Sequence, residues 1–132
     1  MIELAALPLF AGLDDAGLAR VRAVAAEIDV PAGQTLVRPG DPGAGLFVLQ
    51  AGTAVVETGG GHEIEVSPGE FVGELALLVP DSTRSARVRA KTDVHCVAIG
   101  GEDFRKLLED EPRIALAMLP VVAERLWQVR RH

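Results

Sequence analysis

The sequence predicts one α+β domain in which an antiparallel β-barrel is flanked by helices at both ends. Residues 28–100 consist of short apolar runs separated by turns that contain glycine and proline, which is typical of antiparallel sandwiches and closed barrels. The flanking segments, 1–27 and 101–132, place apolar residues at spacings of three and four, as amphipathic helices do. A length of 132 residues suits a single domain.

The N-terminal segment predicts a capped helix behind an apolar lid. Asp14 and Asp15 are residue types that accept hydrogen bonds from the free amides of a helix start. The apolar stripe of this helix is expected at Leu18, Val21, Ala25 and Ile28. The lid surrounds Pro8 and Gly12 and comprises Leu4, Leu7, Leu9, Phe10 and Leu13.

The barrel is predicted from seven short runs with the composition of strands. They are Ile28–Val30, Thr35–Arg38, Leu46–Gln50, Thr53–Glu57, Glu63–Val66, Ser85–Ala90 and Val94–Ile99. Alternation in the sixth run places Val88 and Ala90 inside and Arg87, Arg89 and Lys91 on a solvent face. The triple glycine at 59–61 suits a hairpin tip, and no helix that could complete a phosphate site follows it.

The C-terminal segment predicts two helices. The first covers Asp103–Asp110, and the second begins at Pro112, a position where a helix tolerates proline. Pro120 should kink or split the second helix, because proline cannot donate the backbone hydrogen bond. Its apolar stripe, which suits either a core or the pairing of two copies, consists of Ile114, Met118, Val122, Leu126 and Val129.

Charge and composition exclude several function classes. Thirteen basic against nineteen acidic residues give a net charge of −6, which disfavours direct binding to nucleic acid. Aromatic residues make up only 4%, too few for base-stacking platforms. The single cysteine, Cys96, lies in an apolar run and is expected to be buried and inert. Without a signal peptide or a run of ~18 apolar residues, a cytoplasmic protein with no membrane contact is expected.

The candidate ligand-binding groups are concentrated in residues 69–90. Gly73 lets the backbone approach a ligand closely, and the start of a one- or two-turn helix at Leu75–Val79 offers free amides to an anion. Glu74 can accept hydrogen bonds from sugar hydroxyls. Arg84 has the parity of the inward-facing strand residues, and its planar guanidinium matches a phosphate. Together with the hydroxyl of Ser85, these groups predict a binding site for a ribose phosphate.

This segment resembles the phosphate-binding cassette of cyclic-nucleotide-binding domains, especially those of the catabolite activator (Crp/Fnr) type. The family pattern Phe-x-Gly-Glu-Leu-Ala-Leu stands here at 71–77, and Arg-Ser-Ala stands at 84–86. The resemblance extends over the barrel through Gly40-Asp41, 46–49, Gly52 and 55–56. It implies the family's jelly roll, a double-stranded β-helix, as one domain over 1–132: N-terminal helices at 1–27, the barrel at 28–100 with its cassette at 69–90, and C-terminal helices at 101–132.

The resemblance also implies roles for individual residues. Glu74 would bind the ribose 2′-hydroxyl, Arg84 would pair with the cyclic phosphate, and Ser85 would add a hydrogen bond. The backbone contacts would come from Gly73, Leu75 and Ala76. Purine contacts from the last helix would come from Trp127, Gln128, Val129 and Arg130.

The function implied is that of a regulatory sensor without catalytic activity. Its ligand would be a cyclic nucleoside monophosphate, cAMP in preference to cGMP, and it would need no cofactor or metal ion. Binding would move the C-terminal helices. The expected partners are an effector protein or an output domain outside these residues, and a second copy paired through the last helix.

Two other functions compete with this one. Glu74 and Arg84 could pair with each other in an empty pocket, which would leave the domain a structural or dimerisation scaffold. A barrel of this kind can also house a metal-dependent enzyme, but His62, His95 and His132 are widely separated and no nucleophile stands beside a base. An enzyme is therefore not expected.

Overall fold

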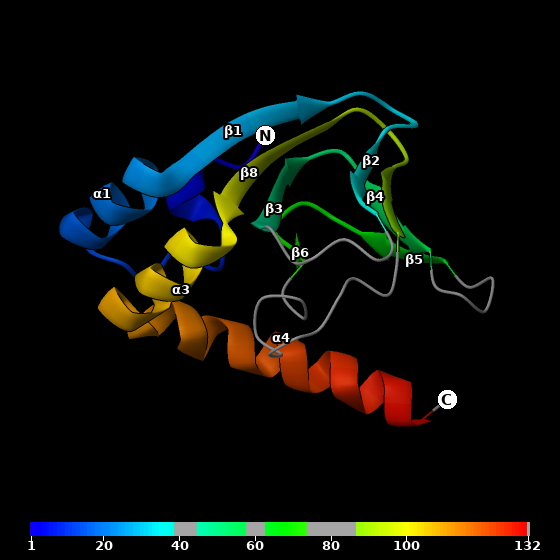
Figure 1. Cartoon of the computed structure of the whole chain (residues 1–132). Helices are drawn as coiled ribbons and strands as arrows, with labels where there is room; N and C mark the ends of the chain where they lie inside the picture. The colour runs from blue at the N-terminus through cyan, green and yellow to red at the C-terminus, as the bar shows by residue number, and fades with distance from the viewer. Residues whose placement is uncertain (39–44, 58–62, 74–86, 132) are drawn as a thin grey trace.

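The computed structural model describes residues 1–38, 45–57, 63–73 and 87–131. For residues 129–131 it describes the backbone alone. Its elements follow one another as helix, strands and helices (Figure 1). They are η1 (Leu4–Ala6), α1 (Asp15–Val24), β1 (Ala25–Val30), β2 (Thr35–Val37), β3 (Gly45–Ala51), β4 (Ala54–Glu57), β5 (Glu63–Val66), β6 (Phe71–Val72), β7 (Arg87–Ala90), β8 (Val94–Gly100), α3 (Gly101–Asp110) and α4 (Pro112–Arg131).

The strands form two antiparallel four-stranded sheets. One has the order β1-β8-β3-β6 and the other the order β2-β7-β4-β5. Consecutive strands β3 and β4, like β7 and β8, therefore lie in different sheets, and the chain crosses from one sheet to the other at each of these turns. This arrangement confirms the predicted antiparallel jelly roll with flanking helices.

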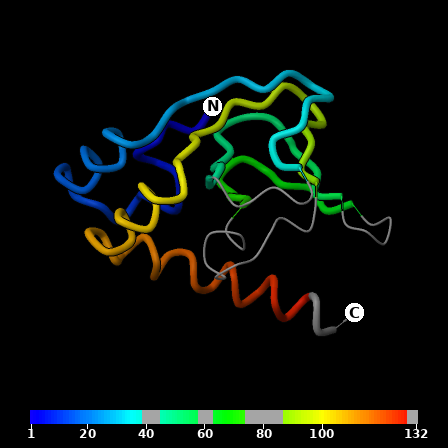
Figure 2. Tube along the Cα trace, viewed as in Figure 1, coloured from blue at the N-terminus to red at the C-terminus, as the bar shows by residue number. Residues whose placement is uncertain are grey.

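The β1-β8-β3-β6 sheet separates two apolar clusters. Its inner face meets the second sheet, and its outer face is covered by the N-terminal segment and the helices, which lie together on one side of the barrel (Figures 1 and 2). The inner cluster consists of Val30, Val37, Leu49, Ala54, Val66, Val72, Val88, Ala90, Val94 and Cys96. The outer cluster consists of Leu7, Leu9, Phe10, Val21, Leu46, Val48, Phe71, Val97, Ile99, Phe104, Leu107, Ile114 and Met118.

The N-terminal prediction is confirmed in part. Asp14 caps α1 by accepting a hydrogen bond from the amide of Gly17 at 2.8 Å. The predicted helical stripe, however, was wrong beyond Val21, because Ala25 and Ile28 lie in β1. Residues 25–30 pair with every residue of β8 from Ile99 back to Val94, and these ladder hydrogen bonds outweigh the helical propensity of the alanines. The strand thus begins three residues earlier than its apolar run indicates.

The C-terminal prediction also needs correction. Helix α4 begins at Pro112 as predicted. It continues through Pro120, so the predicted split is wrong, and the alternative of a kink at Pro120 stays a prediction. Pro120 lies on the exposed side of the helix, where water can satisfy the carbonyl that loses its donor. In the predicted stripe, Ile114 and Met118 are buried, whereas the side chain of Leu126 is 55% exposed. At this point along the helix, the residue of α4 that contacts the sheet is Arg125 instead.

Candidate functional site

Strand β6 lies near the start of the predicted cassette. It is last in its sheet among the described strands and pairs with β3 through Val48 opposite Phe71 and Phe47 opposite Val72. Both residues of β6 are buried, Phe71 among the helices and Val72 between the sheets. The start of the cassette is therefore held on both faces of the sheet.

The turn before β6 is closed by a local hydrogen-bond network. The Glu70 carboxylate accepts from the amide of Ser67 at 2.7 Å, while the Glu70 amide donates to the Ser67 carbonyl at 3.1 Å. On the β3 side, Leu49 donates to the carbonyl of Glu70 at 2.9 Å and accepts from Gly69 at 2.7 Å. Four short hydrogen bonds thus fix the direction in which the chain enters β6.

The cassette is bracketed by the two sheets. Gly73 follows β6 with a φ of 96°, a left-handed conformation that suits glycine. The chain returns at β7, which lies in the second sheet between β2 and β4. Val88 and Ala90 of β7 are buried and Arg89 is not, as the predicted alternation requires. The segment between β6 and β7 therefore joins one sheet to the other.

Most residues of the predicted ligand site fall within that segment. Gly73 is described, and the other five lie outside the described residues. They are Glu74, Leu75, Ala76, Arg84 and Ser85. The predicted helical turn at Leu75–Val79 also lies outside them. Their roles stay predictions.

The predicted purine contacts lie on the far half of α4. Trp127 is 57% exposed, and Gln128 donates a hydrogen bond to Glu124 one turn earlier on the same helix, at 2.8 Å. The side chains of Val129 and Arg130 lie outside the described residues. The role of these four residues in binding a purine stays a prediction.

Arg125 instead touches the start of the cassette, and the sequence analysis missed it. Its guanidinium Nη2 donates to the carbonyl of Phe71 at 2.6 Å, and its Cζ lies 4.7 Å from the centroid of the Phe71 ring. The signal that could have found it is its position seven residues after Met118, on the same face of the helix. The apolar stripe drew attention to Leu126, one residue further on.

His95 lies in a separate polar cluster on the outer face of the same sheet. Its Nδ1 is 2.7 Å from Oδ1 of Asp29, and its Nε2 is 3.5 Å from Oε1 of Glu27. The hydrogen bond with Asp29 raises the pKa of His95, and the hydrogen bond from Gln50 lowers the pKa of Glu27. The amide of Gln50 also donates to the carbonyl of Ile2 at 3.0 Å, so this cluster ties the first residues to the sheet. It is an anchoring network.

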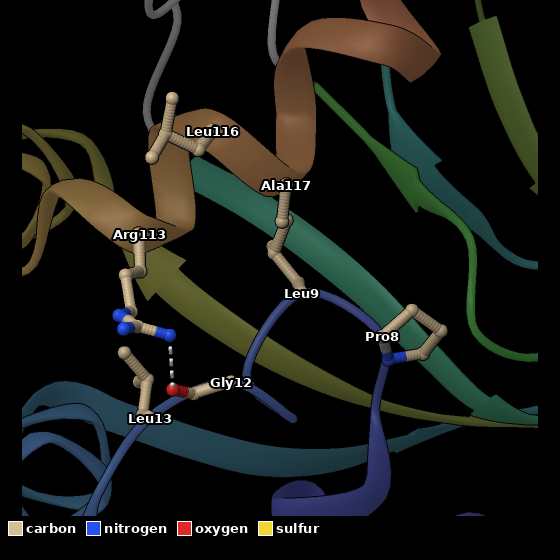
Figure 3. A pocket seen from close by; sticks show the side chains of 7 residues that line it. All are labelled: Pro8, Leu9, Gly12, Leu13, Arg113, Leu116 and Ala117. Carbon is tan, nitrogen blue, oxygen red and sulfur yellow. Dashed lines mark hydrogen bonds between the residues drawn. The ribbon is translucent and has the colours of Figure 1, made fainter.

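Two other features were compared with the predicted site. Cys96 is fully buried, and burial raises the pKa of its thiol to about 11, in agreement with an inert cysteine. A pocket of about 420 Å³ lies between the N-terminal segment and the first turns of α4 (Figure 3). Among the described residues that line it, Arg113 is the charged one and donates to the carbonyl of Gly12 at 3.5 Å, and none carries a carboxylate that could bind a sugar hydroxyl. Its composition does not match the predicted nucleotide site.

The flanks of the cassette and the two sheets can now be compared with known proteins. Residues 27–111 match the family model of the cyclic nucleotide-binding domain. The chain belongs to the cyclic nucleotide-binding domain family. The match begins within β1 and extends through the remaining strands and α3, so the fold and the family follow from nearly the same residues.

Relatives of this cyclic nucleotide-binding domain include channels and transcription regulators. A cyclic nucleotide-gated potassium channel of Mesorhizobium japonicum is 38% identical over 92% of the chain, which spans 33% of the channel. The N-terminal domain of a transcriptional regulator from Streptomyces coelicolor is 37% identical, with a TM-score of 0.66 over 94% of this chain and 90% of that one. The catabolite activator protein of Thermus thermophilus is 29% identical, with a TM-score of 0.78 over 93% and 60%. The chain thus spans about a third of the length of the channel relative.

In the ranges 1–38, 45–57, 63–73 and 87–131, the His, Cys, Asp and Glu side chains form no group of three arranged to hold a metal ion. Among the helices of these ranges, none is long and apolar enough to cross a membrane.

Proposed function

We propose that this domain is a regulatory sensor that binds a cyclic nucleoside monophosphate between β6 and β7 and signals through α4. The main support for the proposal is that the residues matching the family model include both strands that flank the segment 74–86. Phe71, Val72 and Gly73 stand where the family pattern begins, at the edge of one sheet, and β7 receives the chain in the other. The segment that would hold the ligand thus connects the two sheets.

The proposed ligand contacts are those implied by the cassette. Glu74 accepts from the ribose hydroxyl, Arg84 pairs with the cyclic phosphate, and Ser85 adds a hydrogen bond. Gly73, Leu75 and Ala76 supply backbone groups. We propose cAMP in preference to cGMP, and the end of α4, from Trp127 to Arg130, for the purine. The domain performs binding without chemistry and needs no further cofactor.

Thermal unfolding with cAMP, cGMP and 5′-AMP tests this proposal. A ligand at a hundred times its dissociation constant adds about 2.7 kcal/mol to the free energy of unfolding. At about 4 °C per kcal/mol for a domain of this size, the melting temperature rises by about 10 °C. The rise is expected with cAMP, is absent with 5′-AMP, and is lost in Arg84→Ala. Equal melting temperatures with and without each nucleotide would identify the domain as a scaffold.

An exposed apolar face on α4 favours a second copy of the chain as a partner. Leu116, Leu119, Leu126 and Trp127 are each more than half exposed and recur at helical spacing. A helix of 20 residues is about 30 Å long, so two copies of this face can pair around a two-fold axis. We therefore propose a homodimer through α4, with an effector protein or an output domain as the receiver of the signal and the cytoplasm as its location.

The oligomeric state tests the dimer. Light scattering after size exclusion is expected to give twice the chain mass for the wild type. Leu119→Glu, in the middle of the exposed face, is expected to give a monomer. Ile64→Glu is the matched control, because Ile64 is 59% exposed on β5, away from α4. A monomeric wild type, or a dimer that Leu119→Glu leaves intact, contradicts pairing through this face.

A further inference from the structure

Arg125 makes two contacts with one residue of the strand that enters the cassette. Its Nη2 donates to the carbonyl of Phe71 at 2.6 Å, and its charge lies over the ring of the same residue, 4.7 Å from the centroid. A hydrogen bond from a charged donor is about twice as strong as one between neutral groups. The guanidinium also lies within the roughly 6 Å at which a cation is attracted to a ring face. Arg125 therefore joins α4 to β6 through both the backbone carbonyl and the side-chain ring of Phe71.

The position of β6 explains why this carbonyl can accept from a helix. The carbonyl of Glu70 accepts from the amide of Leu49 in β3. Carbonyls alternate in direction along a strand, so the carbonyl of Phe71 points away from β3. Among the strands that the structure describes, β6 is last in its sheet, and none of them lies on that side. An arginine from α4 satisfies an acceptor that the sheet leaves open.

The contact lies directly before the proposed ligand site. Phe71 is 3% exposed and packs in the outer cluster, so the ring gives Arg125 a fixed surface. Only Val72 separates it from Gly73, where the chain turns into the cassette. A change in backbone direction at Gly73 turns the neighbouring peptide groups, and the carbonyl of Phe71, two residues earlier, is bound to α4 through Arg125.

We propose that Arg125 is a positioning residue that transmits the conformation of the cassette to α4. This inference rests on the proposed function, and it assigns the step by which an occupied site is reported. Arg125 holds the far half of α4 against β6 through the carbonyl and ring of Phe71. When the ligand draws the cassette into its bound conformation, the reoriented carbonyl moves the guanidinium, and α4 follows.

Amide hydrogen exchange without ligand tests the attachment itself. Arg125→Ala is expected to speed exchange of residues 121–128 on the order of ten-fold, the effect of losing a hydrogen bond to a charged group. Arg125→Lys should restore part of the protection, because the ammonium keeps the charge but loses the planar fork. Arg113→Ala is the matched control on the same helix, since its side chain faces Gly12 rather than β6. Equal exchange in the wild type and Arg125→Ala would overturn the proposal.

The same measurement with cAMP tests transmission. In the wild type, cAMP is expected to slow exchange both in 71–90, which reports occupancy, and in 114–124, which reports α4. In Arg125→Ala, calorimetry should give a dissociation constant within about three-fold of the wild type, and 71–90 should still respond, while the response of 114–124 falls by more than half. A residue that only stabilises the fold would not separate these two responses.

The outcomes distinguish the two proposals. A wild type that binds no cyclic nucleotide contradicts the proposed function, and the exchange rates without ligand still decide whether Arg125 attaches α4. A wild type that binds cAMP and shows the response in both regions, together with an Arg125→Ala variant that does the same, contradicts transmission through Arg125 alone. A wild type that binds without any change in 114–124 contradicts it as well.

Discussion

Replacement of Gly52 by alanine tests how the two sheets are joined. Gly52 lies in the turn between β3 and β4 with a φ of 84°. A Cβ at this position would clash with the carbonyl oxygen of Asp93, in the turn between β7 and β8. Both turns cross from one sheet to the other. They are bound together by Thr53, whose carbonyl accepts from Lys91 at 2.9 Å and whose amide donates to Thr92 at 2.9 Å.

The magnitude has two parts. An alanine at positive φ costs about 1–2 kcal/mol. Separating the two turns by the distance that a methyl group needs adds the cost of a backbone shift, about 1–3 kcal/mol. The free energy of unfolding of Gly52→Ala is therefore expected to fall by about 2–5 kcal/mol. The clash cannot be relieved by a side-chain rotation, because the nearest atom belongs to the backbone of Asp93.

Gly33→Ala is the matched control. Gly33 has a φ of 90°, yet a Cβ built there has no neighbour within 4 Å, so it retains the conformational cost and lacks the clash. Its expected loss is about 1–2 kcal/mol. Urea unfolding followed by circular dichroism measures both variants. Equal losses in Gly52→Ala and Gly33→Ala would refute the reasoning, because the contact between the turns would then contribute nothing.

Three further predictions concern the core and the pH dependence. Phe104→Ala removes a fully buried ring from the outer cluster and should cost about 3–5 kcal/mol by urea unfolding. The pKa of His95 is raised in the folded protein, where this side chain pairs with Asp29 and Glu27. These ion pairs therefore stabilise the fold fully below the unfolded pKa of about 6.5. The stabilisation is lost as the pH rises through the pKa of His95 in the folded protein. The unfolding free energy of wild type minus that of His95→Gln should therefore fall between pH 5.5 and 8.5, by less than about 1 kcal/mol because the carboxylates are exposed; a difference that rises with pH contradicts this sign. Cys96 should not react with a thiol reagent at pH 8 until the protein unfolds, since its pKa is about 11; rapid labelling of the folded protein would show that the thiol is reachable.

Local rules predicted much of this fold from the sequence. The side-chain cap of Asp14, the start of α4 at Pro112 and the alternation of Val88 and Ala90 each depend on neighbours within a few residues. The polar face of β7 followed in the same way, and its charges are paired across the sheet, as Arg89 is with Glu57 at 2.7 Å.

The errors occurred where distant residues decide the structure. Ala25 and Ile28 fit a helical stripe, but pairing with β8, some seventy residues away in sequence, turns them into a strand. Leu126 continues an apolar pattern along α4, yet the neighbouring Arg125 donates to the carbonyl of Phe71 in β6, which is last in its sheet among the described strands. The helix therefore turns a charged residue, Arg125, toward β6 and leaves the leucine exposed.

The outer cluster includes residues on both sides of the span that matches the family model. The family match ends at 111, but Ile114 and Met118 of α4 fill the same cluster as Leu7 and Phe10 from the other end of the chain. A fragment limited to 27–111 would expose the apolar outer face of the β1-β8-β3-β6 sheet to water and should aggregate. Any transplant of this domain into another protein must therefore carry both ends, and a new partner is best joined beyond them.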